Sequence, residues 1–360
     1  MLKKIEKIVA HVKMHLSVLT CVCSIGVVVP NVAQAIPFSD ISQVYFFGDS
    51  LTDSGFNNNF TALAGFPAKA PTFTTFGGYT WAQYIAHDIK GFSLPTGPFP
   101  TTSDKITNNT TFTFPDPVPF VTPDLTGIDY ACGGAKTTSN PGMDLTWAPS
   151  IQQQIANYLA TAPARLDPKA VYFIWSGAND ILAALSQVPL PNQVQLLRVA
   201  DATTSNIVNL VDILGARGAK RIVVMSLPNI GSTPLVNRLS VELGDATIPA
   251  QVKNLSFIFS SMLNQKLGVV IAKHRMKVLY FDTYAALDNL ITNAKRGVPT
   301  VIDGQAFYFV NYTTPVCGTV EAILCPNTSD GYIFADSVHP TDMAHHALSL
   351  EVEQRIKSWS

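Results

Sequence analysis

The stretch VYFFGDSLTDSG, residues 44–55, begins with an apolar run that stops at Gly48 and is followed by Asp49 and Ser50. A short apolar run that ends at a glycine is typical of a buried strand with a tight turn after it. Such a turn would place Ser50 at the mouth of a sheet and near a helix start. Taken alone, a serine there is more typical of a helix cap than of a nucleophile.

Four later runs resemble the first one: GIDYA (127–131), VYFIW (171–175), RIVVMSL (221–227) and KVLYF (277–281). Helix-like stretches lie around 77–89, 151–160, 198–216, 250–274, 283–295 and 341–358. This alternation predicts an α/β fold, a three-layer α/β/α sandwich with a doubly wound, parallel, five-stranded sheet. In such sheets ligands bind beyond the carboxyl ends of the strands, so residues that follow each strand are candidates for a functional site.

Glycine or polar residues closely follow two of the predicted strands. Gly133 and Gly134 come after the second run, and Asn179 and Asp180 come after the third. Two adjacent glycines let backbone amides approach a ligand, although they are also common in turns. The amide of Asn179 could donate a hydrogen bond to an oxyanion, whereas Asp180 is interpreted as the cap of a helix that begins at Ile181.

The segment DSVHPT near the end of the chain places Asp336 three residues before His339. A carboxylate at this spacing can accept a hydrogen bond from the imidazole, fix its tautomer and stabilise its cationic form. The alternative is an ordinary surface turn, because Asp, Ser and Pro are turn residues. Asp53, close to Ser50, is interpreted as a helix cap.

The first 35 residues have the pattern of a signal peptide. Met1 to His15 contains four lysines, an apolar run covers 16–29, and Ala33 and Ala35 form an A-x-A site, which predicts cleavage after Ala35. A membrane anchor is the alternative, but the run is short for a span, and we expect no later segment to be long and apolar enough to span a membrane. We therefore expect residues 36–360 to form one secreted or periplasmic domain.

The net charge of the chain argues against one class of binding partner. Without residues 1–35 the chain loses four lysines and one glutamate, which leaves a formal net charge of −4. The absence of a basic stripe argues against binding to nucleic acid.

Three cysteines remain, and Cys317 and Cys325 close a short loop, so an exported chain is expected to join them in a disulfide. Two free buried thiols are the alternative, and a metal site made by two cysteines is weaker still.

Residues 56–126 do not follow the strand and helix rhythm. The segment is rich in Pro and Thr and contains ten phenylalanines. It is either a long loop with a small core of its own or an apolar wall that binds an apolar substrate.

The order of Ser50, the Gly-Gly pair, Asn179 and Asp336-x-x-His339 resembles a known family, the GDSL esterases and lipases, or SGNH hydrolases. The matching blocks are FFGDSLTDSG, YACGGA, GAND and DSVHP, and the resemblance runs from Val44 to the last helix. It implies a flavodoxin-like three-layer fold and a serine hydrolase that needs no cofactor or metal. The G-x-S-x-G elbow of other serine hydrolases is absent around Ser50.

The resemblance also implies the role of each residue. Ser50 would be the nucleophile, His339 the general base and acid, and Asp336 the group that orients His339. The oxyanion hole would consist of the Ser50 amide, the side chain of Asn179 and the amide of Gly134, with Gly133 as the alternative to Gly134.

Within the family, the chain most resembles secreted bacterial lysophospholipases A and phospholipases A, relatives of glycerophospholipid:cholesterol acyltransferases. This likeness implies a lipid or lysophospholipid substrate, action at a membrane surface and a capacity for acyl transfer. Some of these relatives have a disulfide-bounded loop that is cut on activation. Residues 318–324, between Cys317 and Cys325, would then be a gate that an activating protease opens, and a simple covalent staple is the alternative.

Three other functions are compatible with parts of the pattern. A carbohydrate O-acetyl esterase could use the same fold and the same serine. A metallophosphoesterase would use the aspartates and the asparagine as metal ligands, but it would need several histidines at strand ends, where only His339 is well placed. A non-catalytic binding module could retain the fold, because fold does not guarantee function.

Overall fold

A computed structural model describes residues 36–56, 72–75, 77–91, 110–113, 120–123, 128–139, 142, 148–187, 189–318 and 331–359. Residues 34–360 make up one compact unit. The expected signal peptide, most of the segment 56–126 and the loop 319–330 lie outside the described residues.

The centre of this unit is a parallel sheet whose strands lie in the order β1-β4-β5-β6. The strands are β1 (Val44–Gly48), β4 (Val171–Trp175), β5 (Arg221–Met225) and β6 (Lys277–Phe281). All four start in register, so their carboxyl ends meet along one edge of the sheet. The expected α/β sheet is therefore present, and the four strands follow four of the five predicted apolar runs.

The fifth predicted strand, at 127–131, is not a regular strand. Its backbone still pairs with β1, since the Phe46 amide donates to the Ile128 carbonyl at 2.9 Å and the Tyr130 amide donates to the Phe46 carbonyl at 2.9 Å. Only the bridge between Phe46 and Asp129 is recorded there. The segment is short because the buried Asp129 carboxylate accepts hydrogen bonds from Ser54 and the chain turns at Gly134. It occupies the outer position that a doubly wound sheet requires.

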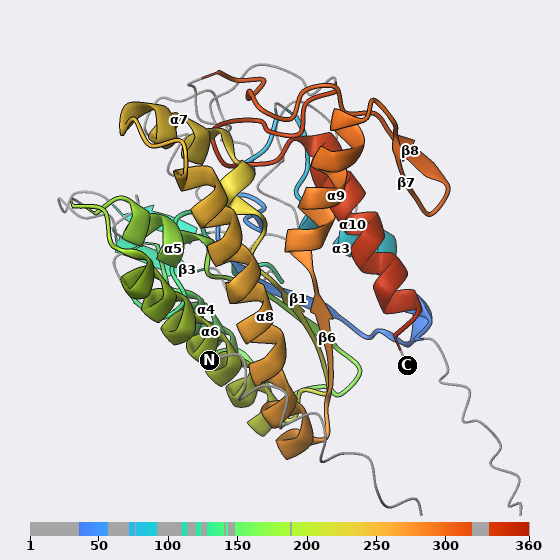
Figure 1. Ribbon diagram of the computed structural model, residues 1–360. Helices are drawn as coiled ribbons and strands as arrows, with labels where there is room; N and C mark the ends of the chain where they lie inside the picture. Colours follow the sequence, from blue (N-terminus) through green and yellow to red (C-terminus); the bar gives the residue numbers. More distant parts are fainter. Residues whose placement is uncertain are drawn as a thin grey trace, which may run out of the picture. The chain divides into compact units, whose positions relative to one another are not determined.

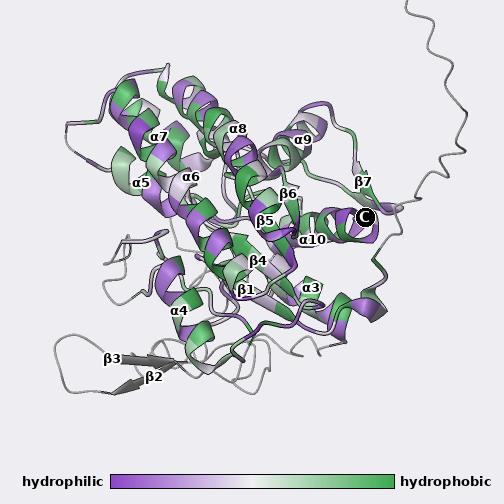
Figure 2. Cartoon of the chain, turned by 90° about the horizontal axis from the view of Figure 1, so that it is seen from below, coloured by the Kyte–Doolittle hydropathy of each residue, from purple (hydrophilic) through white to green (hydrophobic). Residues whose placement is uncertain are grey.

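Helices cover both faces of the sheet (Figures 1 and 2). Side chains such as Phe47, Tyr172 and Val224 pack against one set of helices. That set is α4 (Ile151–Thr161), α5 (Ala178–Leu185), α6 (Gln193–Ala216) and α8 (Ile248–His274). Their neighbours in the strands, such as Phe46 and Phe173, pack against α3 (Trp81–Lys90) and α10 (Asp342–Lys357) on the other face. This is the predicted three-layer sandwich.

Several smaller elements lie around this sandwich. They are η2 (Phe38–Asp40), β2 (Thr110–Thr113), β3 (Phe120–Pro123), η3 (Ile230–Ser232), α7 (Pro234–Glu242), α9 (Thr283–Lys295), β7 (Thr300–Ile302) and β8 (Gln305–Phe307). The sequence did not predict α7, which begins at a proline after the cap Thr233. Helix α9 follows β6 and continues beyond the carboxyl end of the sheet, next to α10 (Figure 1).

Two expectations about helices need correction. Helix α6 begins at Gln193 rather than near 198, because Asn192 and Gln195 form a capping box. Helix α8 is long and apolar enough by composition to cross a membrane, although no segment after the first 35 residues was interpreted as a span. Its buried residues include Phe259 and Leu263, which belong to the core on one face of the sheet, so its apolar character is that of a core helix.

Candidate active site

Ser50 lies in a tight turn at the carboxyl end of β1. The Gln154 side chain, from α4, bonds both the amide and the carbonyl of Gly48 at 2.9 Å and fixes the end of the strand. The Asp49 carbonyl then accepts hydrogen bonds from Thr52 and Asp53, each at 3.0 Å. Glycine is required at 48 because a Cβ there would lie 2.6 Å from the Thr52 Oγ1. No regular helix begins at Ser50 within the described residues, so Ser50 is not a helix cap.

Ser50, His339 and Asp336 form one hydrogen-bonded chain. The Ser50 Oγ is 2.8 Å from the His339 Nε2, and the His339 Nδ1 is 2.7 Å from the Asp336 Oδ2. The second oxygen of Asp336 accepts the amides of Val338 at 2.8 Å and His339 at 2.7 Å. All three residues are buried. A hydroxyl, an imidazole and a carboxylate in this order can move a proton off the serine.

The carboxylate of Asp336 is ionised over the ordinary pH range. Burial alone would raise its pKa, but the charge of His339, the hydrogen bond to the imidazole and two backbone hydrogen bonds lower the pKa to about 2. An ionised acceptor at Nδ1 keeps the proton of the neutral imidazole on that nitrogen. The Nε2 atom is then the acceptor that faces the Ser50 hydroxyl.

The two glycines at 133 and 134 have different roles. The Gly133 amide donates to the Asp53 Oδ2 at 2.7 Å and is therefore already used. Gly134 has a φ of 77°, a left-handed conformation that favours glycine. Within the described residues, neither the Gly134 amide nor the Ser50 amide has a hydrogen-bond acceptor. Of the two glycines, Gly134 is thus the one with an amide available to a ligand.

Asn179 lies in the first turn of α5, behind Gly177, whose φ of 114° makes the turn possible. Its Nδ2 donates one hydrogen to the Ala135 carbonyl at 3.0 Å, which leaves the second hydrogen for a ligand. Asn179 and Gly134 line the same cavity as Ser50. Ser50, Gly134 and Asn179, the three residues proposed from sequence for an oxyanion hole, therefore border one space.

Two aspartates that the sequence suggested as helix caps bind the loop around Gly133 and Gly134. For Asp53 the cap stays a prediction, because residues 57–71 lie outside the described residues. Asp180 accepts the Thr137 amide at 3.0 Å and the Thr137 Oγ1 at 2.8 Å, and α5 begins before it, at Ala178, so the interpretation as a cap for Ile181 is wrong. Asp53 accepts the amides of Gly55 at 2.8 Å and Phe56 at 2.7 Å besides that of Gly133. Both bind the loop that carries Gly133 and Gly134 to the rest of the site.

Buried acids surround the serine turn. Burial raises the pKa of Asp49 to about 7, although the Leu51 amide and the charge of His339 counteract this effect. Burial likewise raises the pKa of Asp53 to about 6, against three backbone hydrogen bonds and the charge of His339. No sequence motif indicated this environment, because it arises from packing between distant segments.

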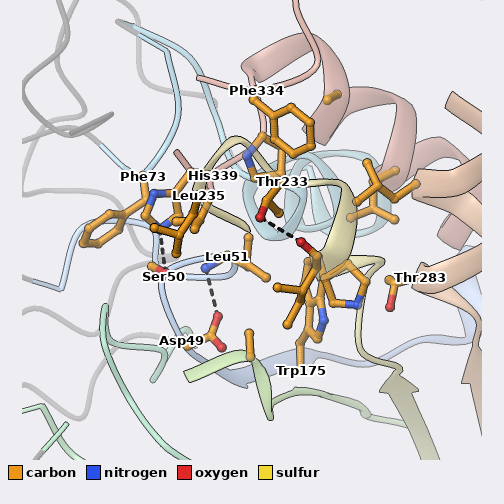
Figure 3. Close-up of a pocket in the computed structure, with 18 of the residues that line it drawn as sticks. Asp49, Ser50, Leu51, Phe73, Trp175, Thr233, Leu235, Thr283, Phe334 and His339 are labelled. Atoms are coloured by element: carbon orange, nitrogen blue, oxygen red, sulfur yellow. Dashed lines mark hydrogen bonds between the residues drawn. The ribbon is translucent and has the colours of Figure 1, made fainter. Parts of the chain in front are cut away.

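The site opens into a cavity of about 530 Å³. Ser50 and His339 lie in its wall together with Trp175 and Thr283 (Figure 3). Most of the remaining wall is apolar and comes from α5, η3, α7, α9 and α10, with side chains such as Leu182, Ile230, Leu235, Leu290 and Leu348. A cavity of this size and character suits an apolar ligand with a polar group at the serine.

Cys317 is buried and disulfide-bonded. Its expected partner Cys325 and residues 319–324 of the proposed gate lie outside the described residues, so the pairing and the gate stay predictions. Cys132 is a buried thiol that is not part of a disulfide. In the part of the chain that the structure describes, no group of three or more His, Cys, Asp or Glu side chains could hold a metal ion.

Comparison with known proteins places this chain in a family. The family model of GDSL-like lipases and acylhydrolases matches residues 44–352. Two GDSL esterase/lipases of Arabidopsis thaliana are each 25% identical to this chain, one over 86% of both chains and the other over 91% of this chain and 92% of its own. Lipase 1 of Photorhabdus luminescens is 25% identical over 57% of this chain and 25% of its own length.

Proposed function

We propose that this chain, which belongs to the GDSL-like lipase/acylhydrolase family, hydrolyses lipid esters through an acyl-enzyme on Ser50. The chain is a carboxylic ester hydrolase, as its relatives and its family indicate. The lipid substrate and the roles of individual residues are the proposed part. The observation that carries the proposal is the Ser50–His339–Asp336 chain in the wall of an apolar cavity.

In the first half of the reaction, the His339 Nε2 removes the proton of Ser50 while the Oγ attacks the ester carbonyl carbon. The imidazolium is stabilised by Asp336, which stays ionised. The amides of Ser50 and Gly134 and the Asn179 Nδ2 donate to the oxyanion, and one such donor is worth about 100–1,000-fold in rate. The imidazolium then protonates the leaving alcohol, and the C–O bond to that alcohol breaks.

In the second half, water takes the place of the alcohol next to the His339 Nε2. His339 removes one proton from the water as its oxygen attacks the acyl carbon, and then returns that proton to the Ser50 Oγ as the acyl–serine bond breaks. The product is a free carboxylic acid. An alcohol in place of water would give a new ester, and this is the route by which the chain would act as an acyltransferase.

A lysophospholipid or a phospholipid is the substrate class that we propose. The apolar wall of the cavity supports a long acyl chain over the acetyl group of an O-acetyl sugar ester. Arg238 is the one Arg or Lys among the described residues that line the cavity, and its side chain is half exposed. An arginine in that place is suited to the phosphate of a lipid head group.

Export, action at a membrane surface and control by residues 318–324 belong to this proposal as well. They follow from the signal-peptide pattern of residues 1–35 and from the Cys317–Cys325 spacing. If the pair closes a regulatory loop, cutting that loop should change the activity on a lipid.

The test combines a variant with a substrate panel. Ser50→Ala is assayed on phospholipid, lysophospholipid, triglyceride and acetylated sugar esters, next to Ser186→Ala, whose exposed hydroxyl donates to the Ala183 carbonyl. We expect loss of activity in Ser50→Ala alone and the highest kcat/KM on a phospholipid or lysophospholipid. Activity retained in Ser50→Ala would refute the serine mechanism, and a preference for acetylated sugar would support the carbohydrate esterase.

A further inference from the structure

The cavity extends away from Ser50 along two helices. Residues 283, 286, 287 and 290 of α9 and residues 344, 347, 348 and 351 of α10 line it. Both sets follow helical spacing, so each helix presents one continuous side to the cavity. Seven residues of helix correspond to about 10 Å of length. Helices α9 and α10 therefore border a channel roughly two helical turns long.

The chemistry of the two steps decides which half of an ester fits this channel. The leaving alcohol has to reach the His339 Nε2, and water has to reach the same point afterwards. Six of these eight lining residues are alanine or leucine, and the other two are Thr283 and Glu351, so most of the channel wall favours a hydrocarbon chain over water. The acyl group, in contrast, stays bound to Ser50 through both steps and needs no exit until the end.

We propose that the acyl chain of the substrate lies between α9 and α10 and that Ala286 and Ala347 set the longest chain accepted. This proposal rests on the proposed lipid hydrolysis. Ala347 is only 1% exposed and, like Leu290 from α9, belongs to the apolar cluster between these helices. At both alanines a larger side chain would occupy channel space.

The chain offers a matched control for one of these positions. Ala286 lines the channel, whereas its neighbour Ala285 is exposed to solvent and does not line it. Ala286→Leu and Ala285→Leu add the same three carbon atoms to the same turn of α9. A difference between the two variants therefore reports on the channel and not on helix propensity.

The assay uses p-nitrophenyl esters of increasing acyl length and, separately, acetate esters of alcohols of increasing length. For Ala286→Leu we expect the ratio of kcat/KM on long acyl esters to kcat/KM on the acetyl ester to fall by about tenfold or more, with the dependence on alcohol length keeping its wild-type form. Ala285→Leu should match the wild type. Ala347→Val is the second variant, with a smaller effect of the same direction.

An unchanged acyl profile in both Ala286→Leu and Ala347→Val would overturn the assignment. A change in the alcohol series in place of the acyl series would show that the channel holds the alcohol. Retained acetyl ester turnover shows that the variants fold and that the serine chemistry is intact. Failure of the channel is thus distinguishable from failure of the proposed hydrolysis.

A second inference concerns Phe73, whose ring packs against the catalytic imidazole. The two ring centroids are 5.0 Å apart, and the planes are inclined by 37° (Figure 3). The segment that carries Phe73 is bound to the loop after His339, because the Thr74 Oγ1 donates to the Pro340 carbonyl at 3.1 Å and the Asp342 amide donates to the Thr75 Oγ1 at 3.1 Å. Phe73 is therefore fixed relative to His339.

The imidazole is held at its edges by hydrogen bonds and on one face by this ring. Ser50 and Asp336 bind the two nitrogen atoms, and neither prevents the ring plane from tilting. An aromatic face within about 6 Å also attracts a cation. We infer that Phe73 is a positioning residue that orients His339 and stabilises the imidazolium formed after proton transfer.

Other titratable groups near His339 come from elsewhere in the fold. Asp336 lies on the same turn, Asp49 and Asp53 come from the turn after β1, and His345 comes from α10. None of them belongs to the segment 72–75 that carries Phe73. The Phe73 backbone also acts on His345. A substitution at this position changes the side chain and not that backbone group, so we expect a change in the titration of His339 to report on the ring.

The variants Phe73→Leu and Phe73→Trp test this role through the dependence of kcat/KM on pH. Leucine keeps apolar bulk without a π face, so we expect the acidic limb to move to lower pH by roughly half a unit and kcat to fall. In Phe73→Trp, which keeps an aromatic face, we expect the acidic limb to lie at its wild-type pH. An acidic limb that stays in place in Phe73→Leu, or one that moves equally in Phe73→Trp, would overturn the inference and leave Phe73 as packing alone.

Discussion

The Asp53 Oδ2 accepts the amide hydrogen of Gly133 at 2.7 Å, across 80 positions of the chain. This bond ties the turn that carries Ser50 to the loop that carries Gly134. The nucleophile and one expected oxyanion donor are therefore held in fixed relation by a carboxylate that does not line the cavity. Asp53 is also buried among backbone amides, which satisfy its other oxygen.

The first prediction concerns this bond. In Asp53→Asn the side-chain NH₂ group would face the Gly133 N–H, and two hydrogen-bond donors would then meet. If the side chain flipped, the NH₂ group would instead face the amides of Gly55 and Phe56, which would lose their acceptor. We expect kcat to fall by about 10–100-fold with little change in KM. Asp303→Asn, at an exposed surface pair with Lys357, is the control. Steady-state kinetics check this, and an unchanged kcat would contradict it.

The second prediction concerns Asn179. Its Nδ2 has one hydrogen committed to the Ala135 carbonyl and the other available in the cavity. Asn179→Ala should lower kcat by about 100–1,000-fold, while KM stays near the wild-type value because the donor acts on the transition state. Kinetics on one soluble ester check this, with thermal unfolding to confirm the fold. A loss in KM alone would mean that Asn179 binds the ground state.

The third prediction concerns acid pH. The folded pKa of Asp336 is lowered to about 2, below the unfolded value, so its contribution to stability is complete above pH 4 and is lost as pH falls toward 2. Asp336→Asn removes that contribution. The stability difference between wild type and variant should therefore be constant from pH 7 to 5 and shrink below 4. Chemical unfolding at several pH values measures it, and a difference that grows in acid would be the opposite result.

The fourth prediction concerns Glu353 on α10. Burial, together with the charge of Asp88 and a hydrogen bond with it, raises the pKa of Glu353 to about 8. The neutral acid is favoured in the folded state, so its ionisation destabilises the fold progressively as pH rises from about 4.5 to 8. Glu353→Gln should gain about 1–3 kcal/mol over the wild type at pH 9 and less at pH 5. Equal differences at both pH values would exclude this reasoning.

The sheet was predictable because its strands are continuous apolar runs, which parallel strands covered on both faces require. The same reasoning predicted a full strand at 127–131, where the structure has only an isolated bridge to β1. Its apolar residues pair with β1, but the buried Asp129 side chain turns the chain toward Ser54. Helix α7 was missed because it is short and mostly exposed, with Val236 as its one buried residue, so it lacks the apolar pattern of a core helix.

The candidate site was predictable to the level of motifs and no further. The motifs place Ser50, Asn179 and the Asp336–His339 pair after strands or near the last helix. The structure brings Ser50, Asn179 and His339 to one cavity, and Asp336 binds the far nitrogen of His339. The choice between Gly133 and Gly134 depends on Asp53, a contact that no local pattern encodes. Phe73 was one of ten phenylalanines in the segment 56–126, and only the tertiary structure distinguishes it as the neighbour of His339.

The central claim is that Ser50 carries the acyl group, and trapping of the intermediate tests it most directly. The enzyme is mixed with a p-nitrophenyl ester, quenched in acid within the first turnover, digested and analysed by mass spectrometry. We predict an acyl adduct on the peptide that contains Ser50, absent in Ser50→Ala and strongly reduced in His339→Ala. An adduct on another residue, or turnover in Ser50→Ala at the wild-type rate, would contradict the account.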